Sequence, residues 1–181
     1  IGCGSVGTSV IQALKMVSAY PIVSVDISNE KLEFSKEFGA THIVNSSEGD
    51  PVKEIQAITN GGADFAFDAT GVRITAEQLL PSTRAGGPGA DNHGGMSVLV
   101  GTSGTEITLD PRLILGPQRQ YRGSLGAAIP EQDFQMFLRL YKDGTFPFNK
   151  LVTRRYSLEQ INEACEDLIC GNIMGRGIIL Y

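Results

Sequence analysis

Apolar residues along the first 125 positions alternate between two spacings. Val6, Val10, Leu14 and Val17 recur as on one face of a helix, and residues 22–25 form a short β-branched run. The alternation then repeats, with further strands predicted at residues 41–44, 63–67, 96–100 and 120–125, and further helices that begin near residues 28 and 51 or include residues 79 and 80. Strands that alternate with helices of about 10 to 15 residues indicate βαβ units. The pattern predicts an α/β fold with a doubly wound parallel sheet.

The pattern changes near Gly126. A helix is predicted at residues 131–142, an extended piece at residues 151–156, a helix at residues 158–169 and a terminal strand at residues 177–181. We therefore expect two parts, residues 1–125 and residues 126–181.

Composition excludes several classes of protein. The 181 residues include 41% hydrophobic residues, enough for a folded core, and their formal net charge is −5 without a long basic run. Binding to nucleic acid through phosphate neutralisation is not expected. No apolar stretch approaches the ~18 residues that a membrane span needs. Three cysteines do not form a disulfide framework, so we expect a cytoplasmic protein.

A glycine motif opens the chain. Gly2, Gly4 and Gly7 fit the pattern G-x-G-x-x-G, which at this glycine content (22 of 181 residues) occurs by chance roughly 0.3 times per chain. Asp26 follows Gly7 by 19 residues, and requiring an acid there lowers the chance expectation to roughly 0.03. The motif precedes a predicted helix and Asp26 ends a predicted strand. This order is typical of a dinucleotide-binding turn.

The chemistry of such a turn explains the spacing. Gly2 makes the tight turn, Gly4 lets a pyrophosphate approach the backbone, and Gly7 allows close packing of helix and strand. The free N–H groups of the helix start attract the phosphates. Asp26 can accept hydrogen bonds from the adenosine ribose, and its charge favours NAD over NADP.

The same residues are compatible with two alternatives. The glycines could serve an ordinary turn with Asp26 as a helix cap, or they could belong to a methyltransferase sheet, which also places glycines after its first strand and an acid after its second. The third glycine, which leads directly into an apolar helical face, favours the dinucleotide fold.

The chain resembles the coenzyme-binding half of zinc-type alcohol dehydrogenases of the medium-chain dehydrogenase/reductase superfamily. The resemblance covers nearly all residues in order and is carried by Gly2-Cys3-Gly4-Ser5-Val6-Gly7, Val25-Asp26-Ile27 with Lys31, Phe38-Gly39-Ala40-Thr41, Val98-Leu99-Val100-Gly101, residues 156–164 and Gly175-Arg176-Gly177-Ile178-Ile179. It implies that residues 1–125 form an NAD-binding Rossmann domain and that residues 126–181 return into a catalytic domain. Phe146-Pro147-Phe148 is similar to the benzyl- and aryl-alcohol branch.

The resemblance also implies the roles of individual residues toward NAD. The pyrophosphate would be held by Gly2, Gly4, Ser5 and Gly7, and Val6 would pack against the nicotinamide. The adenosine would meet Asp26, Lys31 and Ile27. The cleft and the carboxamide would be lined by Thr70, Gly71, Val100, Gly101, Thr102, Ser124, Leu125 and Gly126, and Arg176 would reach the pyrophosphate, which a guanidinium pairs with well.

Several features depart from the family. Its catalytic zinc is held by cysteine, histidine and acidic residues upstream of the glycine motif, so we expect neither a metal ligand nor a catalytic residue within these 181 residues. Cys165 and Cys170 have poor ligand spacing and are interpreted as buried or incidental, and His42 and His93 as structural or solvated. The segment from Arg84 to Gly95 is longer than the family's usual turn. Within it, the glycine-rich stretch from Gly86 to Gly95 predicts a mobile surface loop or, alternatively, a lid or contact loop.

The start of the chain is a further departure. The first strand, which is central in a doubly wound sheet, is reduced to Ile1, and omitting a central strand would expose both of its neighbours. We therefore expect residues before Ile1.

The resulting hypothesis is the NAD-binding portion of a zinc-dependent alcohol dehydrogenase, an enzyme that oxidises a small-molecule alcohol to an aldehyde or ketone. This chain alone is expected to be inactive. Its alternatives are a zinc-free quinone or enoyl reductase of the same superfamily, which Asp26 disfavours, and a non-catalytic NAD-sensing module. The resemblance suggests a homo-oligomer, with residues 105–109 at a dimer edge. The sequence does not identify the alcohol.

Overall fold

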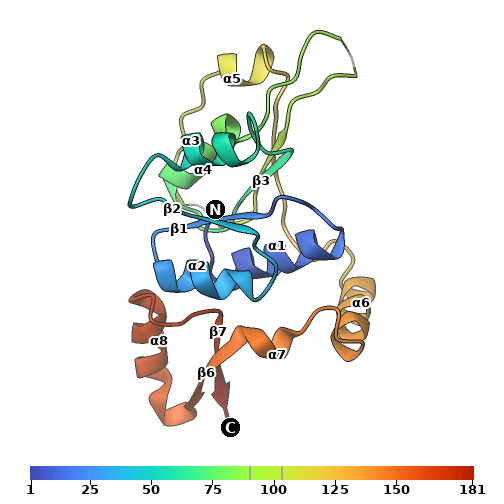
Figure 1. Ribbon diagram of the computed structural model, residues 1–181. Helices are drawn as coiled ribbons and strands as arrows, with labels where there is room; N and C mark the ends of the chain where they lie inside the picture. The colour runs from blue at the N-terminus through green and yellow to red at the C-terminus, as the bar shows by residue number, and fades with distance from the viewer. Residues whose placement is uncertain (90, 103) are drawn as a thin grey trace. The chain divides into compact units, whose positions relative to one another are not determined.

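The computed structural model describes residues 1–89, 91–102 and 104–181, which form two compact units, residues 1–125 and residues 126–181. Helices and strands alternate through the first unit (Figure 1). In order they are α1 (Ser5–Met16), β1 (Val23–Asp26), α2 (Asn29–Lys36), β2 (His42–Asn45), α3 (Pro51–Ile58), β3 (Phe65–Asp68), α4 (Arg73–Ser82), β4 (Met96–Leu99), α5 (Arg112–Leu115) and β5 (Gln120–Gly123).

The strands of the first unit are parallel. β1 pairs with β2, and β3, β4 and β5 form a second sheet with β4 in the middle. Between the two sheets lie Ile1 and Gly2, because the N–H of Gly2 donates to the carbonyl of Val25 (2.7 Å) and the N–H of Ala69 donates to the carbonyl of Ile1 (2.9 Å). The order β2, β1, Ile1, β3, β4, β5 has the reversal of direction along the sheet that defines a doubly wound fold.

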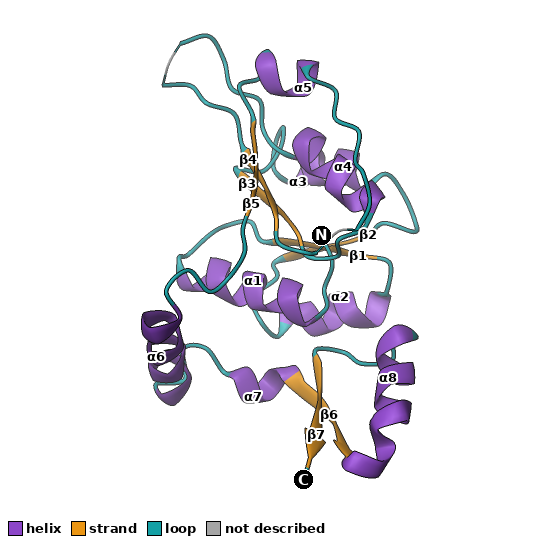
Figure 2. Ribbon diagram, turned by 180° about the vertical axis from the view of Figure 1, so that it is seen from behind, coloured by secondary structure: helices purple, strands orange, loops and turns teal. Residues whose placement is uncertain are grey.

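Helices cover both faces of these strands. In Figures 1 and 2, α1 and α2 lie on one side and α3 and α4 on the other. α2 and α4 are anchored by the fully buried Leu32, Leu79 and Leu80. Local signals fix where helices begin: Ser28 accepts a hydrogen bond from the N–H of Lys31 at the start of α2, and Asp50 caps α3 just before Pro51.

The second unit contains α6 (Pro130–Lys142), α7 (Phe148–Leu151), β6 (Val152–Ser157), a 3₁₀ turn (Leu158–Gln160), α8 (Ile161–Ile169) and β7 (Arg176–Leu180). β6 and β7 form a parallel pair, and the phenol O–H of Tyr156 on β6 donates to the Asp167 carboxylate on α8 (2.8 Å). None of the helices in the described parts of the chain is long and apolar enough to cross a membrane.

The elements predicted from spacing are present, with small differences at their ends. Asp68 is the last residue of β3 rather than the first of a turn, and the helix predicted at residues 158–169 is divided into a 3₁₀ turn and α8. The short helices α5 and α7 were not predicted, because four residues give no helical period.

The described residues of the glycine-rich loop, 86–89 and 91–95, are bonded at both ends of the loop to residues 117 and 118. The N–H of Gly86 donates to Pro117 (2.7 Å), the N–H of Gly94 donates to Gln118 (3.0 Å), and Arg84 donates to the carbonyl of His93 (2.8 Å). These bonds place the base of the loop beside the start of β5.

Candidate functional site

At Gly2 and Gly7 the glycine turn has close contacts that leave no room for a side chain. Gly2 has φ of 91°, and a Cβ there would lie 2.5 Å from Cγ2 of Thr70. A Cβ on Gly7 would overlap the carbonyl oxygen of Gly2 and lie 2.8 Å from its carbonyl carbon. The φ of Gly2 lies in the left-handed region that favours glycine, and real Cβ atoms do not approach backbone as closely as a Cβ on Gly7 would. The turn therefore requires glycine at both positions.

The space in front of α1 is open. α1 starts after Gly4 without a side-chain cap, and a Cβ built on Gly4 would meet no atom within 4 Å. The first N–H groups of a helix have no partner within the helix, and α1 has 12 residues along which peptide dipoles align. The turn therefore presents free donors and partial positive charge to an open space, which fits the phosphates of a dinucleotide.

Asp26 is joined to the glycine turn. Its Oδ2 accepts a hydrogen bond from the N–H of Cys3 (2.7 Å), and its Oδ1 accepts one from the N–H of Ser28 (3.0 Å). A carboxylate has about four acceptor positions, so two are left for hydroxyl groups of a ligand. After Asp26 along the chain, the side chain of Ile27 is 73% exposed, and Lys31 lies in the first turn of α2.

The buried Asp68 organises the next loop, a role that was not predicted from the sequence. Its side chain accepts hydrogen bonds from the N–H (3.1 Å) and hydroxyl (2.7 Å) of Thr70 and from the N–H of Gly71 (3.2 Å). The sequence signal was an acid at the end of an apolar strand, directly before Ala-Thr-Gly.

The loops after β4 and β5 also lie at the carboxyl ends of their strands. The N–H groups of Val100 and Gly101 donate to the backbone carbonyl of Asp68 (2.9 and 2.8 Å), and Thr102 follows them. A Cβ on Gly101 would lie 2.9 Å from the nitrogen of Thr70, so the two loops touch. Ser124, followed by the exposed Leu125, donates its N–H to Leu99 (2.8 Å).

The carboxyl ends of the strands thus bring together most of the predicted residues. In open α/β sheets this edge, at the point where strand order reverses, is where ligands bind. The residues that share it are Gly2, Gly4, Ser5, Val6, Gly7, Asp26, Ile27, Thr70, Gly71, Val100, Gly101 and Ser124. Gly126 and Arg176 belong to the second unit, Arg176 as the exposed first residue of β7.

Comparison with known families identifies the family of this chain. The family described as "Zinc-binding dehydrogenase" matches residues 5–143. The chain belongs to the zinc-binding dehydrogenase family. This confirms the resemblance inferred from the motifs.

Individual relatives support the same family assignment. The chain is 32% identical over 182 residues to an S-(hydroxymethyl)glutathione dehydrogenase of Saccharomyces cerevisiae (96% of the chain, 45% of the relative), and 35% identical over 162 residues to an (R,R)-butanediol dehydrogenase of Bacillus subtilis (90% and 44%). The crystal structure of benzyl alcohol dehydrogenase from Acinetobacter calcoaceticus superposes with a TM-score of 0.87 at 34% identity (98% and 47%), which confirms the α/β class. The chain spans about half the length of these relatives.

The residues present do not fit a zinc ion, despite the family's name. Within residues 1–89, 91–102 and 104–181, no three His, Cys, Asp or Glu side chains gather as a metal site would need. Cys165 and Cys170 are exposed on α8 and at its end. Of the two interpretations of these cysteines, buried or incidental, the structure contradicts the first and is compatible with the second.

Cys3 differs from the other two thiols of this zinc-binding dehydrogenase chain. It is 1% exposed, and burial, with the charge of Asp26 as a smaller cause, raises the pKa of its thiol to about 11. The thiolate is the reactive form, so Cys3 is unreactive at neutral pH.

We expect iodoacetamide at pH 8 to alkylate Cys165 and Cys170 in the folded chain and to leave Cys3 unmodified, because Cys3 is both buried and protonated. Peptide mass spectrometry before and after denaturation measures this. Alkylation of Cys3 in the native chain at the rate of Cys165 would contradict the burial of the glycine turn.

Proposed function

We propose that this chain is the coenzyme-binding portion of an NAD-dependent, zinc-dependent alcohol dehydrogenase that oxidises an alcohol to an aldehyde or ketone. The observation that carries the proposal is the open, uncapped start of α1 with the Asp26 carboxylate bonded to the same turn. Phosphates and a ribose diol are the two chemical groups that this pair recognises.

The proposed contacts with NAD follow the loops at the carboxyl ends of the strands. Residues 2–7 hold the pyrophosphate, Asp26 and Lys31 bind the adenosine ribose, and Ile27 covers the adenine. Residues 70–71, 100–102 and 124–126 line the cleft toward the nicotinamide carboxamide. Contacts among Gly2, Thr70 and Gly101 support one continuous surface for these groups.

We assign to this chain only the part of the reaction that its described residues can carry out. NAD, when bound, accepts a hydride from the alcohol carbon. This chain's own residues bind and orient the coenzyme, and we place neither a catalytic residue nor a zinc ligand among them. Relatives named as alcohol and butanediol dehydrogenases support this activity over a quinone reductase or a sensing module.

Titration of the chain with NADH and NADPH, followed by coenzyme fluorescence, tests the proposal. We expect NADH to bind at least about tenfold more tightly, because a 2′-phosphate would meet Asp26. Arg176→Ala should weaken both coenzymes about tenfold, since a charged hydrogen bond to phosphate is worth ~1.5–3 kcal/mol. Arg155→Ala, an exposed arginine on β6, is the control.

Two results would contradict the proposal. Tighter binding of NADPH would overturn the NAD assignment. Unchanged affinity in Arg176→Ala would remove Arg176 from the site. The homo-oligomer, the edge at residues 105–109 and the cytoplasmic location stay predictions.

A further inference from the structure

The loop after β2 begins beside the end of β1. Asn45, the last residue of β2, is the register partner of Asp26, the last residue of β1. The N–H of Ser46, the first residue of the loop, donates to the carbonyl of Asp26 (3.0 Å). The loop after β2 is therefore a neighbour of the carboxylate that we propose for the adenosine ribose.

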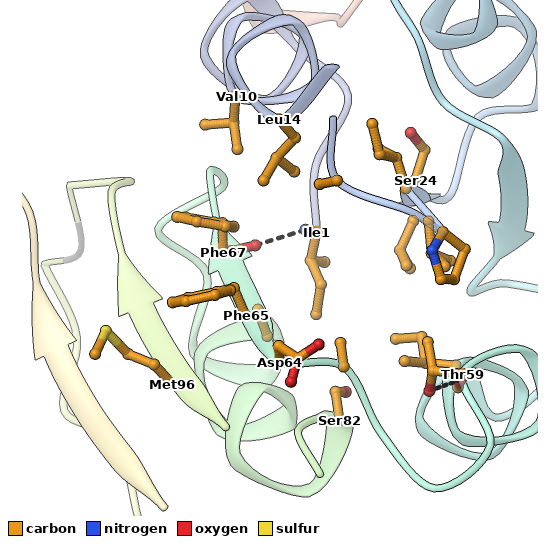
Figure 3. Close-up of a pocket in the computed structure, with 18 of the residues that line it drawn as sticks. Ile1, Val10, Leu14, Ser24, Thr59, Asp64, Phe65, Phe67, Ser82 and Met96 are labelled. Atoms are coloured by element: carbon orange, nitrogen blue, oxygen red, sulfur yellow. Dashed lines mark hydrogen bonds between the residues drawn. The ribbon is translucent and has the colours of Figure 1, made fainter. Parts of the chain in front are cut away.

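The side chains of Asp26 and Asn45 lie on the same face of their strands. Figure 3, a close-up of the cavity between β1 and β3, shows Ser24 directed to the side of β1 on which α1 lies. Residues two apart along a strand share a face, so Asp26 lies on this side as well, in agreement with its bond to the N–H of Cys3 just before α1. Register partners in neighbouring strands also share a face, which places Asn45 there too.

A network of hydrogen bonds joins the loop after β2 to the start of α2. Nδ2 of Asn45 donates to Oδ1 of Asn29 (2.8 Å), the first residue of α2, and to Oε1 of Glu48 (3.0 Å). Nδ2 of Asn29 donates to the same Oε1 (3.3 Å). Asn45 is itself oriented, because its Oδ1 accepts from the N–H (2.9 Å) and the hydroxyl (2.6 Å) of Ser47. The carboxylate of Glu48 is thus held by two amides, one from β2 and one from α2.

These bonds fix a negative charge near Asp26. Neighbouring strands lie ~4.8 Å apart, and Asn45 reaches from β2 to Glu48, so the carboxylates of Asp26 and Glu48 lie within about 10 Å of each other. The screening length is ~8 Å at an ionic strength of ~0.15 M and ~30 Å at ~0.01 M. A charged group bound at Asp26 therefore interacts measurably with Glu48 at low salt.

We propose that Glu48 is a second residue, besides Asp26, that selects NAD over NADP. The inference rests on the proposed function, which places the adenosine ribose at Asp26. A 2′-phosphate on that ribose would bring a charge of about −1.5 to −2 to the end of β1, within the field of the fixed Glu48 carboxylate. NAD has a neutral hydroxyl at the same position and does not meet this repulsion.

The charge of Glu48 opposes that of Lys31. Lys31, in the first turn of α2, is proposed to bind the ribose, but an ammonium group also attracts a phosphate. Glu48 is bonded to Asn29 in the same turn of α2, so its carboxylate weakens this attraction without occupying the ribose site. Lys31 can then serve the ribose hydroxyls of NAD while NADP gains little from it.

Glu48→Gln in the full chain isolates the charge. The amide oxygen of glutamine can accept both hydrogen bonds that Oε1 of Glu48 accepts, so the network is retained and only the charge is removed. We expect the ratio of the NADPH to the NADH dissociation constant to fall about 3-fold at ~0.01 M salt. Glu48→Lys changes the charge by twice as much, and the ratio should fall about 10-fold. Both effects should vanish at ~1 M salt, where the screening length is ~3 Å.

Glu33→Gln is the matched control. It removes the same charge from α2 about one turn beyond Asn29, where Glu33 contacts Lys36 (2.7 Å) rather than the network. Its ratio of dissociation constants should equal that of the parent chain at both salt concentrations. Coenzyme fluorescence titrations of the four chains give all the constants.

The outcomes distinguish this inference from the proposed function. A fall of the ratio that disappears at high salt, is larger in Glu48→Lys and is absent in Glu33→Gln supports a role of Glu48. An unchanged ratio in both Glu48 variants, with NADH bound as in the parent chain, overturns that role and leaves the proposed function intact. Equal shifts in Glu33→Gln, or an equal loss of both coenzymes in Glu48→Gln, also overturn it. A parent chain that binds neither coenzyme overturns both.

Discussion

Gly7→Ala is expected to lose both stability and coenzyme binding. The added Cβ would overlap the carbonyl oxygen of Gly2, and because that oxygen is backbone, α1 and the turn must move apart. Forcing such an overlap in a packed site costs ~2–4 kcal/mol. In a chain of this length the midpoint of thermal unfolding should fall by roughly 5–15 °C.

Gly4→Ala is the matched control for this prediction, because it makes the same chemical change three residues earlier. Its Cβ would meet no atom within 4 Å, so the unfolding midpoint should stay within about 2 °C. The same Cβ enters the space proposed for the pyrophosphate, and NADH affinity should fall about 10- to 100-fold. A Gly4→Ala chain that binds NADH normally would show that the phosphates lie elsewhere. A Gly7→Ala chain of normal stability would show that the turn is not closed as described.

Asp26→Gly is expected to abolish the preference for NAD. Removal of the carboxylate takes away an acceptor for the ribose hydroxyls and the charge that repels a 2′-phosphate, so NADH should bind about 10- to 100-fold more weakly and NADPH no less tightly than before. The N–H groups of Cys3 and Ser28 also lose their acceptor, and the unfolding midpoint should fall by several degrees.

Parallel titrations with both coenzymes measure the effect of Asp26→Gly. Glu33→Gln is the control, because Glu33 is an exposed acid of the same unit that contacts Lys36 at the surface. Both its affinities and its stability should match those of the parent chain. If Asp26→Gly still prefers NADH tenfold, the discrimination has another source.

The helices and strands could be predicted because their signals are local. The spacing of Val6, Val10 and Leu14, the cap at Ser28 and the proline at Pro51 each act within one or two turns of chain. α5 and α7 have four residues each, which is too few to show a helical period.

In the candidate site, too, some features could be predicted from local sequence and others could not. The glycines and Asp26 were predictable because their spacing reflects the geometry of one turn, one helix and one strand. The bond between Asp26 and Cys3, and the bonds from Val100 and Gly101 to the carbonyl of Asp68, were not, because they join segments that only the folded sheet brings together. The hydrogen bonds from Gly86 and Gly94 to residues 117 and 118 are also tertiary, and a glycine-rich composition does not encode them.

The position of Asp68 has a mechanical consequence. Its side chain holds the loop after β3 through Thr70 and Gly71, and its carbonyl holds the loop after β4 through Val100 and Gly101. Two walls of the proposed cleft therefore share one attachment point at the end of a single strand. We expect a ligand that displaces one of these loops to displace the other as well, so that the two loops move together rather than independently.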